Sequence, residues 1–266
     1  MTLIASDPVI VAKFSRAGKH AVELMRDIHK WIDNEAELDI TQSSDLKTAE
    51  LRLHIAAPPP LTEWSVALGD TVHNLRSALD VWTYKYITST YSGTSRIEDR
   101  DIYFPICKNG SDFRNWKNKT GKYLPNSMIS ALREAQPYNS DIPLAESAMW
   151  LIQEFDNADK HREPLAMDFK SKDLKPFIFS TDSPDFTEDS IRVHATSVSI
   201  SEGGLMVVLE SDYPLHDVNL RKGLELVPFF TFEGNSYQLM DTLREFLPGV
   251  QGMLRRLEIS GNPNRK

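Results

Sequence analysis

The feature that most constrains this chain is an apolar stripe in the stretch LGDTVHNLRSALDVWTYKY, residues 68–86. Its members are spaced 4, 3, 4, 3 and 4 positions apart: Leu68, Val72, Leu75, Leu79, Trp82 and Tyr86. This spacing is typical of one face of a helix about five turns long. We therefore predict a helix over residues 61–90, with this stripe packed against other elements.

A second row, of polar type, follows the apolar stripe one residue later. It consists of Gly69, His73, Arg76 and Asp80. One residue corresponds to a rotation of about 100° around a helix, so the polar row lies beside the packing seam. The same helix therefore carries a packing surface and a row of groups that titrate or donate hydrogen bonds.

A later segment repeats both features. Pro143 is expected to open a helix in which the seam spacing recurs at Leu144, Ala148, Leu151, Phe155 and Ala158. Every residue from Asp156 to Arg162 except Ala158 is polar, and Pro164 prevents the helix from continuing much further. The matching seams predict that the two helices pack on one another and bring their polar rows together.

The remaining pattern predicts an α+β fold: a helical bundle of three to four main helices, a small antiparallel sheet and a C-terminal helix. Helices are expected at 9–34 and 126–134, and strands at 47–57, 176–180, 191–199, 205–210 and 224–232. We interpret 37–45 as a loop, 109–120 as a polar segment anchored by Phe113 and Trp116, and Asn235-Ser236 as the cap of the last helix. Pro228 favours an edge or a bulge in its strand. The expected division is a helical domain at 1–165, with one strand near 47–57, and a sheet with the closing helix at 166–266, the two packed as one unit.

The charge and cysteine content restrict the classes of function. The net charge of −8 gives no general attraction to nucleic acid or anionic membranes, so nucleic acid is not an expected partner. The basic side of residues 9–34 is interpreted as a solvated helix face, with polyanion binding as the alternative. A single cysteine, Cys107, excludes an internal disulfide and favours a cytoplasmic location. No signal peptide or membrane-spanning segment is expected, and the oligomeric state is not indicated.

The two polar rows supply the candidate site. The candidate catalytic residues are His73, Asp80, Asp159 and His161, and the candidate ligand-binding residues are Asn74, Arg76, Lys160 and Arg162. Such a set could hold a divalent metal, transfer protons through a histidine oriented by an aspartate, or bind phosphate through its cations. The same residues could equally form a buried network that fixes helix register.

No strong motif selects among these chemistries. The sequence contains no HExxH, GxxxxGK[ST], GxGxxG or GxSxG segment, so no nucleotide cofactor is indicated and the metal content stays open.

The segments GDTVHNLRSALD, FPI, QPY and DNADKHR resemble a widespread family of uncharacterised bacterial proteins. The shared signature is a GDxxHNLRSALD helix followed by a DKHR segment, and the resemblance covers residues 12–165. It marks His73, Asn74, Leu75, Arg76 and Asp80, together with Asp159, Lys160, His161 and Arg162, without implying a reaction.

A looser similarity is to HEPN-type helical domains, which include ribonucleases of defence and toxin systems. Their usual signature is an Arg and a His with four to six residues between them. In this chain Arg16 and His20 are separated by three residues, and the DKHR segment has the reverse order.

Three functional hypotheses follow. The first is a bacterial protein in which the cluster between the two helices binds or acts on a small anionic or phosphate-bearing ligand. The second is a non-enzymatic structural or interaction module whose cluster is a buried register network. The third is a defence or toxin-type ribonuclease.

Overall fold

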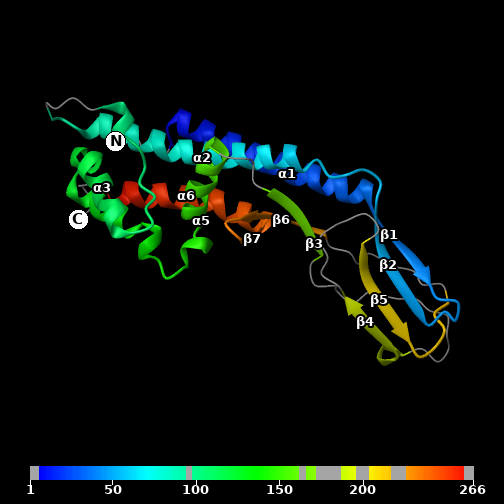
Figure 1. Ribbon diagram of the computed structural model, residues 1–266. Coiled ribbons are helices and arrows are strands. Elements are labelled where there is room, and N and C mark those ends of the chain that lie inside the picture. Colours follow the sequence, from blue (N-terminus) through cyan, green and yellow to red (C-terminus); the bar gives the residue numbers. More distant parts are fainter. Residues whose placement is uncertain are drawn as a thin grey trace. The chain divides into compact units, whose positions relative to one another are not determined.

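The computed structural model describes residues 6–93, 98–161, 166–171, 187–195, 204–216 and 226–260. Helices and small antiparallel sheets together make an α+β fold, as predicted (Figure 1). The chain divides into two compact units. The first comprises Met1–Leu24, Thr62–Leu165 and Met240–Lys266, and the second comprises Met25–Leu61 and Ala166–Leu239, as far as these stretches are described.

The first unit is helical. Its elements are the first part of α1 (Pro8–Glu35), α2 (Leu61–Thr90), α3 (Gly110–Lys119), α4 (Asn126–Glu134), α5 (Ala148–His161) and α6 (Leu239–Ser260). Short 3₁₀ turns lie at Asp99–Asp101, Gly121–Tyr123, Pro137–Asn139 and Leu144–Glu146.

The apolar stripe of α2 is the centre of this unit. Its six members are between 0% and 6% exposed, and α2 has the predicted bounds of 61–90. The corresponding residues of α5, Leu151, Phe155 and Ala158, are also buried, and the Phe155 ring lies 6.2 Å from that of Phe246 in α6. Burial of these stripes is the main source of stability for helices of this kind.

The second unit contains two antiparallel sheets. In the first, the strand order is β1-β2-β5-β4, with bounds Ala36–Gln42, Thr48–Ile55, Leu205–Ser211 and Ile191–Ala195 in that order. In the second, the order is β3-β6-β7, with bounds Ala166–Ser171, Leu226–Phe232 and Asn235–Gln238. A short 3₁₀ turn, Glu188–Ser190, precedes β4. The alternation predicted for 47–57 is observed, because Ala49, Leu51 and Leu53 are buried while Arg52 and His54 are exposed.

Two local predictions were wrong because strand pairing overrides a weak local pattern, and one segment to which no element had been assigned is helical. Residues 36–42 form β1 rather than a loop, since they pair along their whole length with β2. The polar segment 109–120 is largely helix α3, capped by Asn109, whose side chain accepts from the backbone N–H groups of Ser111 and Asp112. Asn235 and Ser236 lie in β7 rather than capping α6, because they pair with Phe232 and Thr231.

Other differences concern boundaries. α5 begins at Ala148, after a separate 3₁₀ turn, rather than directly after Pro143. β6 is the central strand of its sheet, but Pro228 lies one residue beyond the part of β6 that pairs with β7, so it is locally at an edge. β3 was not predicted, and the predicted strand at 176–180 lies outside the described residues.

The division into units differs from the boundary expected at residue 165. Residues 25–61 belong with 166–239 because β2 pairs with β5, more than 150 positions later in the chain. The closing helix belongs with the helical unit. Sheet pairing between segments distant in sequence leaves little local signal, so this discontinuous arrangement could not be predicted from order along the chain.

Candidate functional site

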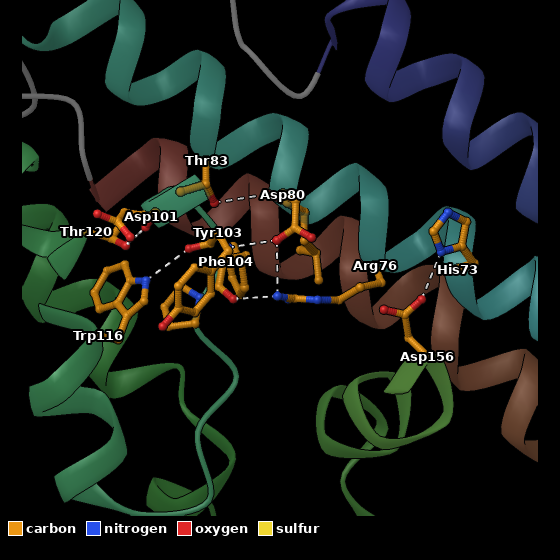
Figure 2. Close-up of polar contacts among 12 residues, drawn as sticks. His73, Arg76, Asp80, Thr83, Asp101, Tyr103, Phe104, Trp116, Thr120 and Asp156 are labelled. Carbon is orange, nitrogen blue, oxygen red and sulfur yellow. Dashed lines mark hydrogen bonds and ion pairs between the residues drawn. The ribbon is translucent and has the colours of Figure 1, made fainter. Parts of the chain in front are cut away.

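The polar row of α2 lies at the edge of its buried face and separates into two pairs (Figure 2). His73 is directed toward Asp156 of α5, whereas Arg76 extends away from that pair toward Phe104 and Asp80. The α2 residues of the predicted cluster therefore take part in two arrangements with different properties.

The first pair joins a half-exposed histidine to a buried carboxylate. The distance between His73 Nδ1 and Asp156 Oδ1 is 2.9 Å, and the side chains are 45% and 2% exposed, respectively. With Asp156 ionised, its oxygens only accept hydrogen bonds, so Nδ1 of His73 carries the proton and donates it. The lone pair of the neutral imidazole is then on Nε2, the atom not held by the carboxylate.

The second arrangement grips an extended backbone segment, residues 101–107, which we call the strap. Arg76 Nη2 donates to the carbonyl oxygen of Phe104 at 2.9 Å and lies 3.1 Å from Asp80 Oδ1. The same Asp80 oxygen accepts from the backbone N–H of Phe104 at 2.9 Å. Two side chains one helical turn apart thus satisfy both backbone groups of one residue, as a neighbouring strand would.

Three further side chains hold the strap. Trp116 Nε1 donates to the Tyr103 carbonyl at 2.9 Å, and the Thr120 hydroxyl donates to the carbonyl of Asp101. The buried Gln136 accepts from the N–H of Cys107 at 2.9 Å and donates to the carbonyl of Pro105 at 3.1 Å. Side chains therefore replace sheet partners along a segment in which Pro105 cannot donate.

Burial near the strap perturbs two titratable groups. Desolvation raises the pKa of the Cys107 thiol to about 11, with a further upward contribution from Asp112 that outweighs the opposing effect of Arg76. Desolvation likewise raises the pKa of the Tyr103 phenol. A thiol with a raised pKa is a poor nucleophile at neutral pH, so Cys107 behaves as a buried apolar side chain.

The predicted site residues have separate environments. Asp80 and Arg76 belong to the strap arrangement, and the Asn74 side chain donates to the carbonyl of Asp70 within α2. Asp159, Lys160 and His161 lie in the last turn of α5, but their side chains lie outside the described part of the structure, as does the whole of Arg162.

Asp156, which orients His73, and Gln136, which holds the strap, were not among the predicted site residues. Asp156 belongs to the polar run from Asp156 to Arg162, but the candidate catalytic aspartate in that run is Asp159. The signal that could have found it was position: Asp156 lies inside the apolar part of α5, directly after the buried Phe155. Gln136 stands in the QPY segment of the resemblance, but the local pattern gives no sign that its side chain is buried, at 2% exposure.

One donor near the strap has no partner. Arg76 is 6% exposed, and its Nη1 atom makes no hydrogen bond. Among the described residues, no group of three or more His, Cys, Asp or Glu side chains is arranged to hold a metal ion. In the same part of the chain, none of the helices has the length and apolar character required to cross a bilayer.

Comparison with known proteins gave no match to any protein-family model, curated protein or solved structure.

Proposed function

We propose that His73 and Asp156 form an acid–base site that binds or acts on a small anionic or phosphate-bearing ligand at His73 Nε2. The observation that carries this proposal is the 2.9 Å contact between a half-exposed imidazole and a carboxylate that is only 2% exposed. The buried carboxylate orients the ring through Nδ1, while Nε2 exchanges protons with the ligand.

Burial distinguishes this pair from an ordinary surface contact. A carboxylate withdrawn from water is costly unless it is hydrogen-bonded or paired. A buried aspartate beside an exposed histidine fixes the tautomer and the direction of the ring, which is the role of the aspartate in catalytic triads. The expected anion selectivity comes from the sequence: Lys160, His161 and Arg162 follow Asp156 within six positions.

A first experiment measures the reactivity of Nε2. Diethyl pyrocarbonate acylates unprotonated imidazole, and mass spectrometry gives the rate at each histidine. We expect His73 to react in the native protein and Asp156→Asn to change its rate of reaction, because the ring is no longer oriented by the carboxylate. His29 is the matched control, because its Nδ1 contacts a neutral acceptor, the carbonyl of Met25, at 2.7 Å. An unchanged rate of His73 acylation in Asp156→Asn would contradict the orienting role.

A second experiment tests the ligand. We expect inorganic phosphate or a small phosphomonoester to shift the ring NMR signals of His73 and to leave those of His29 unchanged. Lys160→Gln should weaken this binding. Asp70→Asn, which removes an exposed carboxylate three residues before His73, should not weaken it. Absence of any shift with phosphate, phosphomonoester or a small carboxylate would exclude the anionic-ligand hypothesis.

The contacts of Arg76 and Asp80 favour the alternative in which the polar residues form a structural network. Arg76 and Asp80 bind the strap backbone rather than facing His73, as a register network would. If His73→Ala lowers the melting temperature sharply and no ligand perturbs the wild-type site, the whole cluster belongs to that network. Cleavage of RNA by the wild-type protein, abolished in His161→Ala or Arg162→Ala, would instead support the ribonuclease hypothesis.

A further inference from the structure

A short segment around α3 has the opposite charge to the chain as a whole. Between residues 108 and 122 there are five basic residues, and Asp112 is the single carboxylate, so the segment has a net charge of +4 in a chain of −8. The five side chains are exposed, and we call them the α3 basic surface: Lys108, Arg114, Lys117, Lys119 and Lys122. α3 is labelled in Figure 1.

These charges are not neutralised within the described part of the chain. None of the five cations forms an ion pair there. The carboxylate of Asp112 accepts instead from Asn109 Nδ2 at 3.0 Å, at the start of the helix. On α1, by contrast, Lys19 pairs with Glu23 and Arg26 with Asp27, so acidic residues are interleaved with the cations.

Packing holds the central cations together. Arg114 and Lys117 are three positions apart and occupy neighbouring places on α3. The stem of Lys117 lies against Gly121, where a Cβ atom would be 3.0 Å from Lys117 Cγ. Glycine at this position therefore lets the Lys117 stem lie beside the turn that carries Lys122. Lys122 in turn lies 4.9 Å from the centre of the Tyr123 ring.

We propose that the α3 basic surface binds the phosphodiester backbone of a nucleic acid without reading its sequence. Unpaired cations and the exposed amides of Asn115 and Asn118 are suited to phosphate oxygens. No large apolar side chain is exposed within 108–122, so the surface lacks the apolar face with which an amphipathic helix inserts among lipids. The chain-wide charge of −8 does not oppose this binding strongly, because salt screens charges beyond about 8 Å at physiological ionic strength.

The test is fluorescence anisotropy with a labelled single-stranded RNA and with DNA of the same sequence, over a series of salt concentrations. For single strands the slope of log K against log salt is about −0.7 per neutralised phosphate. The triple variant Arg114→Gln/Lys117→Gln/Lys122→Gln should therefore weaken binding and flatten the slope by about 2. The matched control Lys19→Gln/Arg26→Gln/Lys30→Gln removes the same charge from α1 and should leave the slope nearly unchanged.

A second variant separates loss of charge from loss of structure. Lys117→Arg/Lys122→Arg retains the charges and should retain binding, and circular dichroism checks that each variant is folded. Equal loss in the two triple variants would show that only overall charge matters and would overturn the proposal. So would salt-independent binding, no binding to either strand, or binding only to vesicles containing phosphatidylserine.

Discussion

Replacing Arg76 by methionine tests whether the strap is held from α2. Methionine keeps the apolar part of the arginine stem but removes the guanidinium. The substitution therefore abolishes the hydrogen bond from Nη2 to the Phe104 carbonyl, at 2.9 Å, and the ion pair of Nη2 with Asp80 Oδ1, at 3.1 Å. Two other side chains of the strap arrangement, Trp116 and Gln136, are unchanged by this substitution.

The magnitude follows from two losses and two effects that offset them. A hydrogen bond to a charged group contributes about 1.5–3 kcal/mol, and the Phe104 carbonyl left without its donor adds a desolvation cost. Two effects reduce the loss: Asp80 is 36% exposed, so water replaces part of its interaction, and the unpartnered Nη1 is removed. We expect a destabilisation of about 2–4 kcal/mol.

Hydrogen exchange at the Phe104 amide is the appropriate measurement, because a chain of two compact units need not unfold in one step. This amide donates to Asp80 Oδ1 and exchanges when the strap opens. The expected loss corresponds to exchange faster by about 30- to 1,000-fold. Arg133→Met removes an exposed arginine of α4 and should change stability by no more than about 0.5 kcal/mol. Equal exchange rates in the two variants would refute the role assigned to Arg76.

Three further predictions concern side chains of the helical unit. Cys107 should resist iodoacetamide at neutral pH in the native protein and react after unfolding. Because burial raises its folded pKa to about 11, the Cys107 thiol should contribute fully to stability below the ordinary thiol pKa, and this contribution should fall as pH rises toward 11. Denaturation over a series of alkaline pH values measures this loss. Gln136→Leu should lower the free energy of unfolding by about 2–4 kcal/mol, because it leaves the N–H of Cys107 and the carbonyls of Pro105 and Leu132 without partners. A loss of stability smaller than that of a Gln→Leu change at an exposed position would contradict this. The hydrogen bond from Lys85 lowers the pKa of Asp7. This pair therefore stabilises the start of α1 at pH values above the ordinary aspartate pKa, and the stabilisation is lost as pH falls through the lowered value. NMR titration should show that the Asp7 pKa rises in Lys85→Gln.

The parts of the fold that were predicted are those with a long local period. The α2 stripe repeats over six positions, and each member is buried as the spacing requires. The parts that were missed have short or polar local patterns. β1 is a strand because it pairs with β2, which begins at Thr48, soon after β1 ends at Gln42, and Gly110–Lys119 is a helix although its polar composition carries a weak apolar period.

For the candidate site, sequence determined that polar groups accompany the two seams, because the period that buries Leu75 and Phe155 places their neighbours at the edge of the buried face. It did not determine which polar groups meet. His73 and Arg76 lie one turn apart with similar local signals, but only the packed structure shows that His73 meets a buried carboxylate while Arg76 binds the strap. That choice depends on where Asp156 and Phe104 lie in space, 83 and 28 positions away in sequence. A local period carries no information about contacts at such separations, and these contacts decide which residue of the polar row meets a buried carboxylate and which holds the strap.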